Sequence, residues 1–210
     1  MKKILFIKII VVLAVVVTVL SGTVLFVVPR REIYQLLFEQ QGMEAQVGMS
    51  AFEAQLNYDG ILQQIAGNQK VTGLMTYVSS DDLRDKIIRL HEIYQCSKWL
   101  CGIGFLLAIV GLIILRKQKW HDCLLWGGIA SIGISALTVL PLYLVKSLRL
   151  FFFGSQYEEY LGYDPILVSI LPKDWALYTW LGGAGLAIVI GVILILFYFG
   201  SRKEYKPHQF

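Results

Sequence analysis

Charged side chains are scarce in this sequence. Asp, Glu, Lys and Arg make up 16% of its 210 residues, whereas hydrophobic residues make up 56%. Soluble domains carry about a quarter charged residues, so this composition excludes an ordinary soluble fold. Lysine and arginine also form no cluster interleaved with aromatic residues, and nucleic acid is therefore not an expected partner.

Cysteine is rare too, and its three positions exclude two common uses of the residue. Cys96 and Cys101 stand five apart on an expected helix, so their side chains point about 140° away from each other and a disulfide is not expected. Cys123 falls near the opposite membrane face. Zinc-site spacing is missing, as are the G-x-S-x-G, H-E-x-x-H and P-loop motifs. The sequence therefore predicts buried, inert thiols, no metal site and no cofactor.

The hydrophobic residues are concentrated in four runs, 4–28, 99–115, 124–144 and 177–199. As a helix, the shortest run covers about 25 Å, close to the roughly 30 Å apolar core of a bilayer. The first run is too long for a signal peptide and no cleavage site follows it, so it is predicted to be a retained span. We expect an all-α membrane protein in which 1–210 forms a single membrane domain around a four-helix transmembrane bundle.

The distribution of lysine and arginine predicts the orientation of the chain. Three short segments are basic, and they share only two acids, whereas segments 29–98 and 145–176 hold thirteen acids and ten bases. The basic residues of the short segments are Lys2, Lys3, Lys8, Arg116, Lys117, Lys119, Arg202, Lys203 and Lys206. By the positive-inside rule both termini are cytoplasmic, and the two longer segments are extracytoplasmic. We expect a multi-pass protein of the cell membrane.

Small residues recur four apart along each predicted span. They are Ala14, Thr18 and Gly22; Gly104 and Ala108; Gly127, Ser131 and Ser135; and Gly183, Ala187 and Gly191. This spacing places each set on one helix face, where neighbouring backbones can approach closely. Apart from Lys8, no ionisable side chain lies inside a predicted span, which argues against a transporter.

The two outer segments carry signs of amphipathic helices. Ser50 and Glu53 form a capping box that predicts a helix at about 51–66, and the apolar residues from Ile33 to Phe38 predict a short helix lying on the bilayer. A short strand is expected at 70–78, and Asp81 begins a helix with no breaker before the second span. The sequence predicts an extracytoplasmic cap of amphipathic helices on the bundle.

Aromatic residues dominate the second outer segment, which begins with Phe151–Phe153 and continues to Tyr163. Two interpretations stay open for them. The aromatic rings form a belt at the level of the lipid headgroups, or they line the lipid-facing lip of a site.

His91 is the candidate for chemistry, because His121 and His208 fall in the cytoplasmic loop and tail. It lies on the outer side, two turns before Trp99, on the helix face shared with Ile87 and Tyr94. A histidine there is either a partly buried helix residue or a general base that works near neutral pH.

The order of these features resembles that of the bacterial lipoprotein intramolecular transacylases. Asn57-Tyr58 followed by Leu62 looks like the family's Asn-Tyr-x-x-Leu-Leu segment, and Leu90-His91 looks like its histidine-containing approach to the second span. The second outer segment matches in order and spacing through Leu150-Phe151-Phe152, Asp164-Pro165 and Leu171-Pro172. One position departs from the family pattern Phe-His-x-x-Phe-Phe, because Leu148 stands where the histidine is expected.

The resemblance implies a reaction and a set of site residues. Family members move an acyl chain from the diacylglyceryl group of a lipoprotein to the amine of its own N-terminal cysteine, which leaves a lyso-form lipoprotein. It implies that His91 is the catalytic base and that membrane lipid and diacylated lipoprotein are the partners. The positioning candidates are Asn57, Tyr58, Tyr94 and Asp164, with Arg149 and Tyr157 as the polar groups nearest to the missing histidine.

Two other functions remain open at the level of the sequence. The chain could be a non-catalytic four-span scaffold or interaction protein, which would make it a divergent and inactive relative of the family. A small transporter is the second alternative, and the scarcity of charge inside the spans opposes it. The sequence carries no prediction of oligomeric state.

Overall fold

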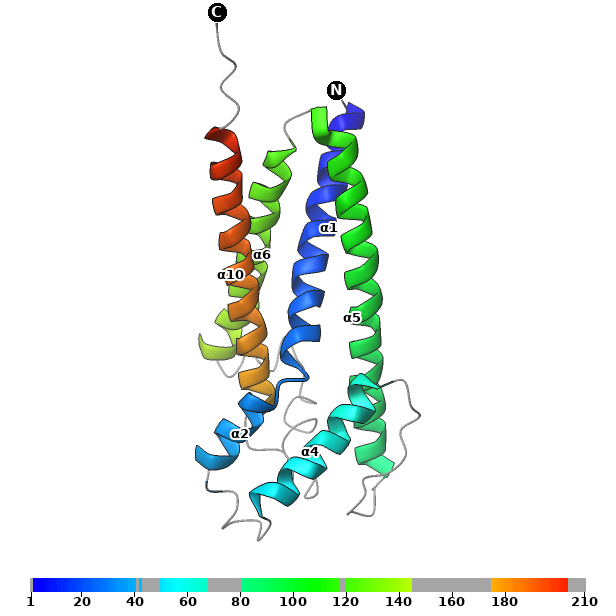
Figure 1. The fold of residues 1–210 in the computed structure, drawn as a ribbon, viewed down its shortest axis with the longest axis vertical. Coiled ribbons are helices and arrows are strands. Elements are labelled where there is room, and N and C mark those ends of the chain that lie inside the picture. The colour runs from blue at the N-terminus through cyan, green and yellow to red at the C-terminus, as the bar shows by residue number, and fades with distance from the viewer. Residues whose placement is uncertain are drawn as a thin grey trace, which may run out of the picture. The chain divides into compact units, whose positions relative to one another are not determined.

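The computed structural model describes residues 2–40, 42, 50–67, 81–117, 120–144 and 175–203, and these residues form helices without a strand. The α-helices are α1 (Lys2–Val27), α2 (Arg31–Gln40), α4 (Ala51–Ala66), α5 (Asp81–Ile114), α6 (His121–Leu144) and α10 (Trp175–Lys203) (Figure 1). A 3-10 turn at Leu115–Lys117 follows α5. The predicted all-α fold class is confirmed for the described residues, and the predicted strand at 70–78 lies outside them.

Four of these helices are long and apolar enough to cross a membrane. Their apolar segments are Lys3–Val27, Leu90–Ile114, His121–Val139 and Tyr178–Ser201. The second segment begins at Leu90, earlier than the predicted 99. Helix α5 runs unbroken from Asp81, and residues 90–98 contain only two charged side chains, Glu92 and Lys98. The chain is therefore a multi-pass membrane protein.

The chain divides into two compact units. The first unit contains Met1–Val24, Ser97–Leu140 and Gly183–Phe210, and the second contains Leu25–Cys96 and Pro141–Gly182. The prediction of a single domain over 1–210 stays a prediction, since the compactness of each unit does not decide whether they fold together.

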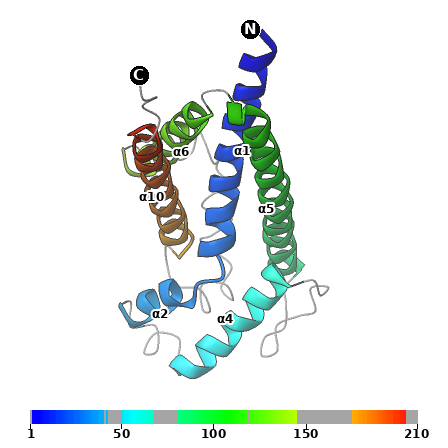
Figure 2. The same ribbon diagram turned by 45° about the horizontal axis from the view of Figure 1, so that its top comes forward.

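Helices α1 and α5 of the first unit approach closely at a glycine. A Cβ atom added to Gly104 would lie 2.7 Å from the Thr18 Oγ1 atom and 3.2 Å from the Ala14 carbonyl oxygen. Such distances leave no room for a side chain at this position. The predicted small-residue faces of the first two spans are therefore in contact, and Figure 2 shows the two helices side by side as in Figure 1.

Helices α6 and α10 make a second close approach. A Cβ atom on Gly128 would lie 2.7 Å from the Gly191 carbonyl oxygen, and one on Gly191 would lie 2.9 Å from the Gly128 carbonyl oxygen. Gly191 belongs to a predicted small-residue face. Gly183, from the same predicted face, has no neighbouring atom within 4 Å of such a Cβ, so only part of that face is a close contact.

Polar side chains lie inside the first unit and large apolar ones lie on its surface. Ser131 and Ser135 are fully buried, whereas Leu106, Leu137 and Leu196 are more than 60% exposed. Soluble proteins show the opposite arrangement. The exposed leucines fit a surface that faces lipid, where small and polar residues mediate helix contacts instead.

An ion pair joins α1 to the first turn of α6. The Lys8 Nζ atom lies 3.1 Å from the Asp122 Oδ2 atom, so the ionisable residue predicted inside the first span has a partner. The neighbouring His121 is partly buried, and its Nδ1 atom lies 3.3 Å from the Ser201 Oγ atom. His121, which the sequence placed in the cytoplasmic loop, is therefore the first residue of α6, and its side chain contacts α10.

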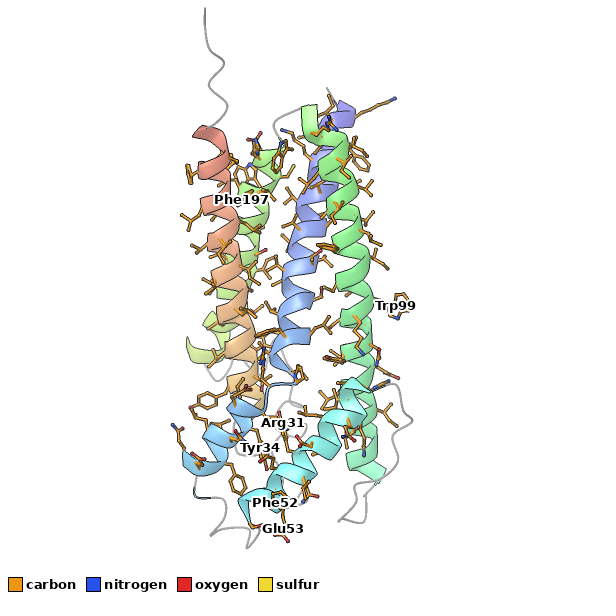
Figure 3. The ribbon with its side chains drawn as sticks, viewed as in Figure 1. Arg31, Tyr34, Phe52, Glu53, Trp99 and Phe197 are labelled. Atoms are coloured by element: carbon orange, nitrogen blue, oxygen red, sulfur yellow. The ribbon has the colours of Figure 1, made fainter. Side chains whose placement is uncertain are left out.

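In the second unit, α2 and α4 pack through stacked aromatic rings. The capping box predicted at Ser50 and Glu53 is present at the start of α4. The Tyr34 and Tyr58 rings stack with centroids 4.1 Å apart, and the Tyr34 hydroxyl donates to the Ala54 carbonyl oxygen at 3.2 Å. Figure 3 shows Tyr34 on the side of α2 that faces α4. The predicted helices at 33–38 and 51–66 are therefore both present and lie in contact.

The cysteines are free, and only one of them is buried. Cys123 is buried, Cys101 is partly exposed and Cys96 is exposed. The prediction of three buried thiols was therefore right for Cys123, wrong for Cys96 and only partly right for Cys101. The face of α5 that carries Cys96 is not covered by another described helix.

Candidate functional site

The described part of the candidate site lies where the end of α4 packs against the first half of α5. The His91 Nδ1 atom on α5 lies 3.0 Å from the Gln64 carbonyl oxygen and 3.0 Å from the Ile65 carbonyl oxygen. Both carbonyl groups belong to the last turn of α4. Such groups have no partner inside their own helix, so they are available to a side chain from α5.

These two contacts determine which ring nitrogen of His91 carries the proton. A carbonyl oxygen can only accept a hydrogen bond, so the Nδ1 atom must be the donor. In the neutral ring the Nε2 atom then keeps its lone pair and is the basic nitrogen. His91 is partly exposed, so its ring is not sealed in the interior. This is the tautomer that a general base working through Nε2 needs.

Several hydrogen bonds hold the last turn of α4. The Gly67 N–H group donates to the Gln63 carbonyl oxygen at 2.9 Å, and His91 serves the next two carbonyl groups. The Gln95 side-chain amide, one turn after His91 on α5, donates to the Gly67 carbonyl oxygen at 3.2 Å. Two side chains of α5 therefore cap the C-terminal end of α4, in the way that helix ends commonly acquire partners.

Apolar packing supports the same contact. Ile61 and Ile65 of α4 form a buried cluster with Ile87 and Tyr94 of α5. Tyr94 is 8% exposed and stands three residues after His91, on the neighbouring part of the same helix face. The structure therefore brings the predicted site residues His91 and Tyr94 together against the end of α4.

Asn57 and Tyr58 lie on α4 but face different neighbours. Asn57 is buried and shares a face with Ile61 and Ile65, about 10 Å along the helix from Gln64. Tyr58 has no exposed surface, because its ring stacks on Tyr34 and its hydroxyl donates to the Arg30 carbonyl oxygen at 3.4 Å. Asn57 therefore lies on the helix face that leads to His91, whereas Tyr58 packs against α2.

The remaining candidates belong to the second outer segment. Arg149, Tyr157 and Asp164 lie outside the described residues, as does Leu148. Among the residues that are described, no three His, Cys, Asp or Glu side chains gather closely enough to hold a metal ion.

Sequence reasoning missed the groups that orient His91. The Gln64 and Ile65 carbonyl groups are backbone atoms, which no residue pattern identifies, and they stand 27 and 26 residues before the histidine. Gln95 left one signal, since its spacing of four from His91 places both side chains on the same helix face. Its partner Gly67 could be expected only as a residue that ends a helix.

The fold and this arrangement define a class: a four-span membrane protein whose polar candidate site belongs to the second compact unit. No model of a protein family matches the chain, and no curated protein sequence matches it either.

Solved structures with the same fold exist. The chain is similar to the in meso structure of the membrane integral lipoprotein intramolecular transacylase Lit from Bacillus cereus, with a TM-score of 0.85, 19% identity and 97% of each chain covered. It is also similar to two structures of that enzyme in which a histidine is replaced by arginine or alanine. Both have TM-scores of 0.82 and 18% identity, and they cover 97% of this chain and 93% and 95% of the other. The resemblance predicted from the sequence is confirmed for the fold.

Proposed function

We propose that this chain transfers an acyl group within a bacterial lipoprotein, from the diacylglyceryl group to the amine of the N-terminal cysteine. The proposal is supported by the fold, which the chain shares over nearly its whole length with a lipoprotein intramolecular transacylase. The observation that carries it is the hydrogen-bonded Nδ1 atom of His91, which leaves Nε2 as a base.

The reaction converts an ester into an amide without adding water. The cysteine nitrogen attacks the ester carbonyl carbon, a C–N bond forms and the C–O bond to glycerol breaks. His91 Nε2 accepts a proton from the attacking amine and returns one to the departing glycerol oxygen, which becomes a hydroxyl group. The product is an N-acylated lyso-form lipoprotein, and the histidine ends in its starting form.

A base is useful here because the amine is mostly protonated near neutral pH. Terminal amines have pKa values of about 7.7–8.0, and only the neutral amine can attack. Holding amine and ester together can contribute roughly 7–11 kcal/mol to lowering the barrier. Water must be kept from the ester, since hydrolysis would compete, and a site beside lipid-facing helices is suited to that requirement.

The other site residues are proposed to position the substrate and the base. Tyr94 packs against the end of α4 beside His91, Asn57 lies about 10 Å farther along the same face of α4, and Tyr58 packs α4 against α2. Arg149, Tyr157 and Asp164 are proposed from their places in the sequence alone. The partners are membrane lipid and a diacylated lipoprotein.

A bacterium that lacks this activity tests the proposal. Mass spectrometry of its lipoprotein N-termini should find N-acylated lyso-form molecules when the chain is expressed, and none with His91→Ala at equal expression. Lyso-form product from His91→Ala at the wild-type level would rule out His91 as the base. The absence of this product with the wild-type chain would rule out acyl transfer.

The non-catalytic scaffold remains the second candidate, and one observation favours it. His91 caps the end of α4, and a histidine can be retained for that contact alone. The scaffold requires that lipoprotein N-termini be identical with and without the chain. The same mass spectra therefore separate the two functions.

The proposed orientation places both termini in the cytoplasm and segments 29–98 and 145–176 outside. Phe52 on α4 is 70% exposed, and Arg116 after α5 is also exposed. In a chain whose three cysteines are replaced by alanine, Phe52→Cys should react with a membrane-impermeant maleimide in intact cells and Arg116→Cys should not. The reverse labelling pattern would mean that the chain has the opposite orientation in the membrane.

A further inference from the structure

The C-terminal end of α4 is the element that orients His91, and a second side chain holds that end in place. Four contacts are involved. The Gly67 N–H group donates to the Gln63 carbonyl oxygen within α4 and its cap. His91 contacts the Gln64 and Ile65 carbonyl oxygens, and Gln95, four residues later on the same face of α5, donates to the Gly67 carbonyl oxygen.

We propose that Gln95 is a positioning residue, which fixes the end of α4 so that its carbonyl groups keep the His91 proton on Nδ1. The proposal rests on the proposed function, because it assigns a purpose to the free Nε2 atom. Gln95 acts on His91 indirectly, through Gly67 and the backbone between Gly67 and Ile65.

The position of Gln95 explains why a single side chain can hold the end of α4 in place. Helix ends fray readily, because their last carbonyl groups have no partner within the helix. Gly67 is the cap residue and has an extended backbone, with φ −75° and ψ 169°, so the chain leaves the helix there. A donor at Gly67 therefore holds the final turn at the point where fraying would begin. Without that donor, the Gln64 and Ile65 carbonyl groups would no longer be held in one place relative to the His91 ring.

A mixture of the two neutral tautomers would make His91 a less effective base. If the carbonyl groups move away, the neutral ring can carry its proton on either nitrogen, and molecules with the proton on Nε2 cannot accept one there. Partners that orient metal-ligating histidines typically affect metal affinity or activity by 10–100-fold when they are replaced, and we expect a loss near the lower end of that range here. The substrate contacts would be unchanged, so the loss should appear in kcat and not in KM.

The test uses the full-length chain in lipid bilayers, with its histidines labelled with ¹⁵N. The chain has three histidines, and the His91 signals are identified by their absence from the His91→Asn spectrum. The wild-type chain should show a protonated Nδ1 atom and an unprotonated Nε2 atom. Gln95→Met, which keeps the size of the side chain but has no donor, should show both tautomers. Gln95→Lys, which keeps a donor near the negative end of the helix, should restore the wild-type pattern.

The same variants are assayed for acyl transfer on a synthetic peptide with a diacylglyceryl cysteine. We expect kcat to fall about tenfold in Gln95→Met with KM unchanged, and to recover in Gln95→Lys. Gln35→Met, at an exposed glutamine of α2, should match the wild-type chain in both experiments. Wild-type ¹⁵N signals for His91 in Gln95→Met would overturn the proposal. If the wild-type chain makes no product, the proposed function fails, and the spectra alone still decide whether Gln95 fixes the tautomer.

Discussion

The Nδ1 atom of His91 lies 3.0 Å from the carbonyl oxygen of Ile65, so a side chain of α5 closes the last turn of α4. This contact gives the histidine two separable roles. The proton on Nδ1 satisfies the end of a helix, and the lone pair on Nε2 is available for chemistry. Substitutions that keep one of these roles and remove the other distinguish them.

Replacing His91 by asparagine should separate the cap from the base. The asparagine amide nitrogen occupies nearly the place of Nδ1 and can donate to the same carbonyl groups, whereas alanine cannot. We expect His91→Ala to lower the free energy of unfolding by about 0.5–1.5 kcal/mol, the contribution of a typical hydrogen bond, and His91→Asn to lower it by less. Hydrogen exchange at the end of α4 and thermal unfolding in lipid measure both effects. Equal losses in the two variants would mean that the cap contact does not stabilise the protein.

Gly104 should not tolerate a side chain. A Cβ atom there would lie 2.7 Å from Thr18 Oγ1 and close to the α1 backbone, so Gly104→Leu must push α1 and α5 apart. Overpacking of this kind costs about 1–3 kcal/mol. Gly102→Leu is the matched control, because nothing lies within 4 Å of a Cβ atom at that position. Thermal unfolding should place Gly104→Leu below the wild-type chain and Gly102→Leu at or above it.

The stacking of Tyr34 on Tyr58 predicts that the folded protein loses stability at alkaline pH. Burial raises the pKa of the Tyr34 phenol above its usual value, and the neighbouring Tyr58 raises it further. The folded state therefore holds the Tyr34 proton more tightly than the unfolded state does. The free energy of unfolding should be unaffected by Tyr34 below pH of about 10, where both states are protonated. It should decrease as the pH rises above that value.

Tyr34→Phe should remove this part of the pH dependence, and it should cost about 0.5–1.5 kcal/mol at neutral pH through the lost hydrogen bond to Ala54. Tyr178→Phe, at an exposed tyrosine of α10, should leave the decrease in place. Unfolding measured from pH 7 to 11 compares the three chains. A decrease in Tyr34→Phe as steep as in the wild-type chain would exclude Tyr34 as its source.

Local features of the fold could be predicted from the sequence because their causes are local. The capping box at Ser50 and Glu53 determines where α4 begins, and the absence of a breaker after Asp81 makes α5 one long helix. The start of the second span was placed at Trp99 because the residues before it include charged ones. The apolar segment that begins at Leu90 tolerates them, since long side chains can reach the membrane surface.

Contacts between helices could be predicted only in part. Spacing identified Gly104 and Gly191, which do make close approaches, but it also selected Gly183, which does not, and it passed over Gly128 beside Gly127. Periodicity specifies a helix face and carries no information on which turn of that face meets a neighbour. The burial of Cys96 was predicted wrongly for the same reason, because periodicity does not show whether a neighbouring helix covers that turn.

The candidate site was the least predictable part. His91 was singled out by its position, but the groups that orient it are backbone carbonyl groups at the end of another helix. Their identity depends on where α4 ends and how it crosses α5, which is a tertiary property. The spacing of Gln95 from His91 places both on one helix face, but its hydrogen bond to Gly67 depends on the same crossing of α4 and α5.

The most direct test of the account is the rate of acyl transfer by the purified wild-type and His91→Asn chains on a peptide with a diacylglyceryl cysteine. Mass spectrometry follows the appearance of the N-acylated lyso-form peptide. We expect the wild-type chain to form it, and His91→Asn to be folded but slower by at least about 100-fold, the lower end of the contribution of a general base. Product formed by His91→Asn at the wild-type rate would contradict the account.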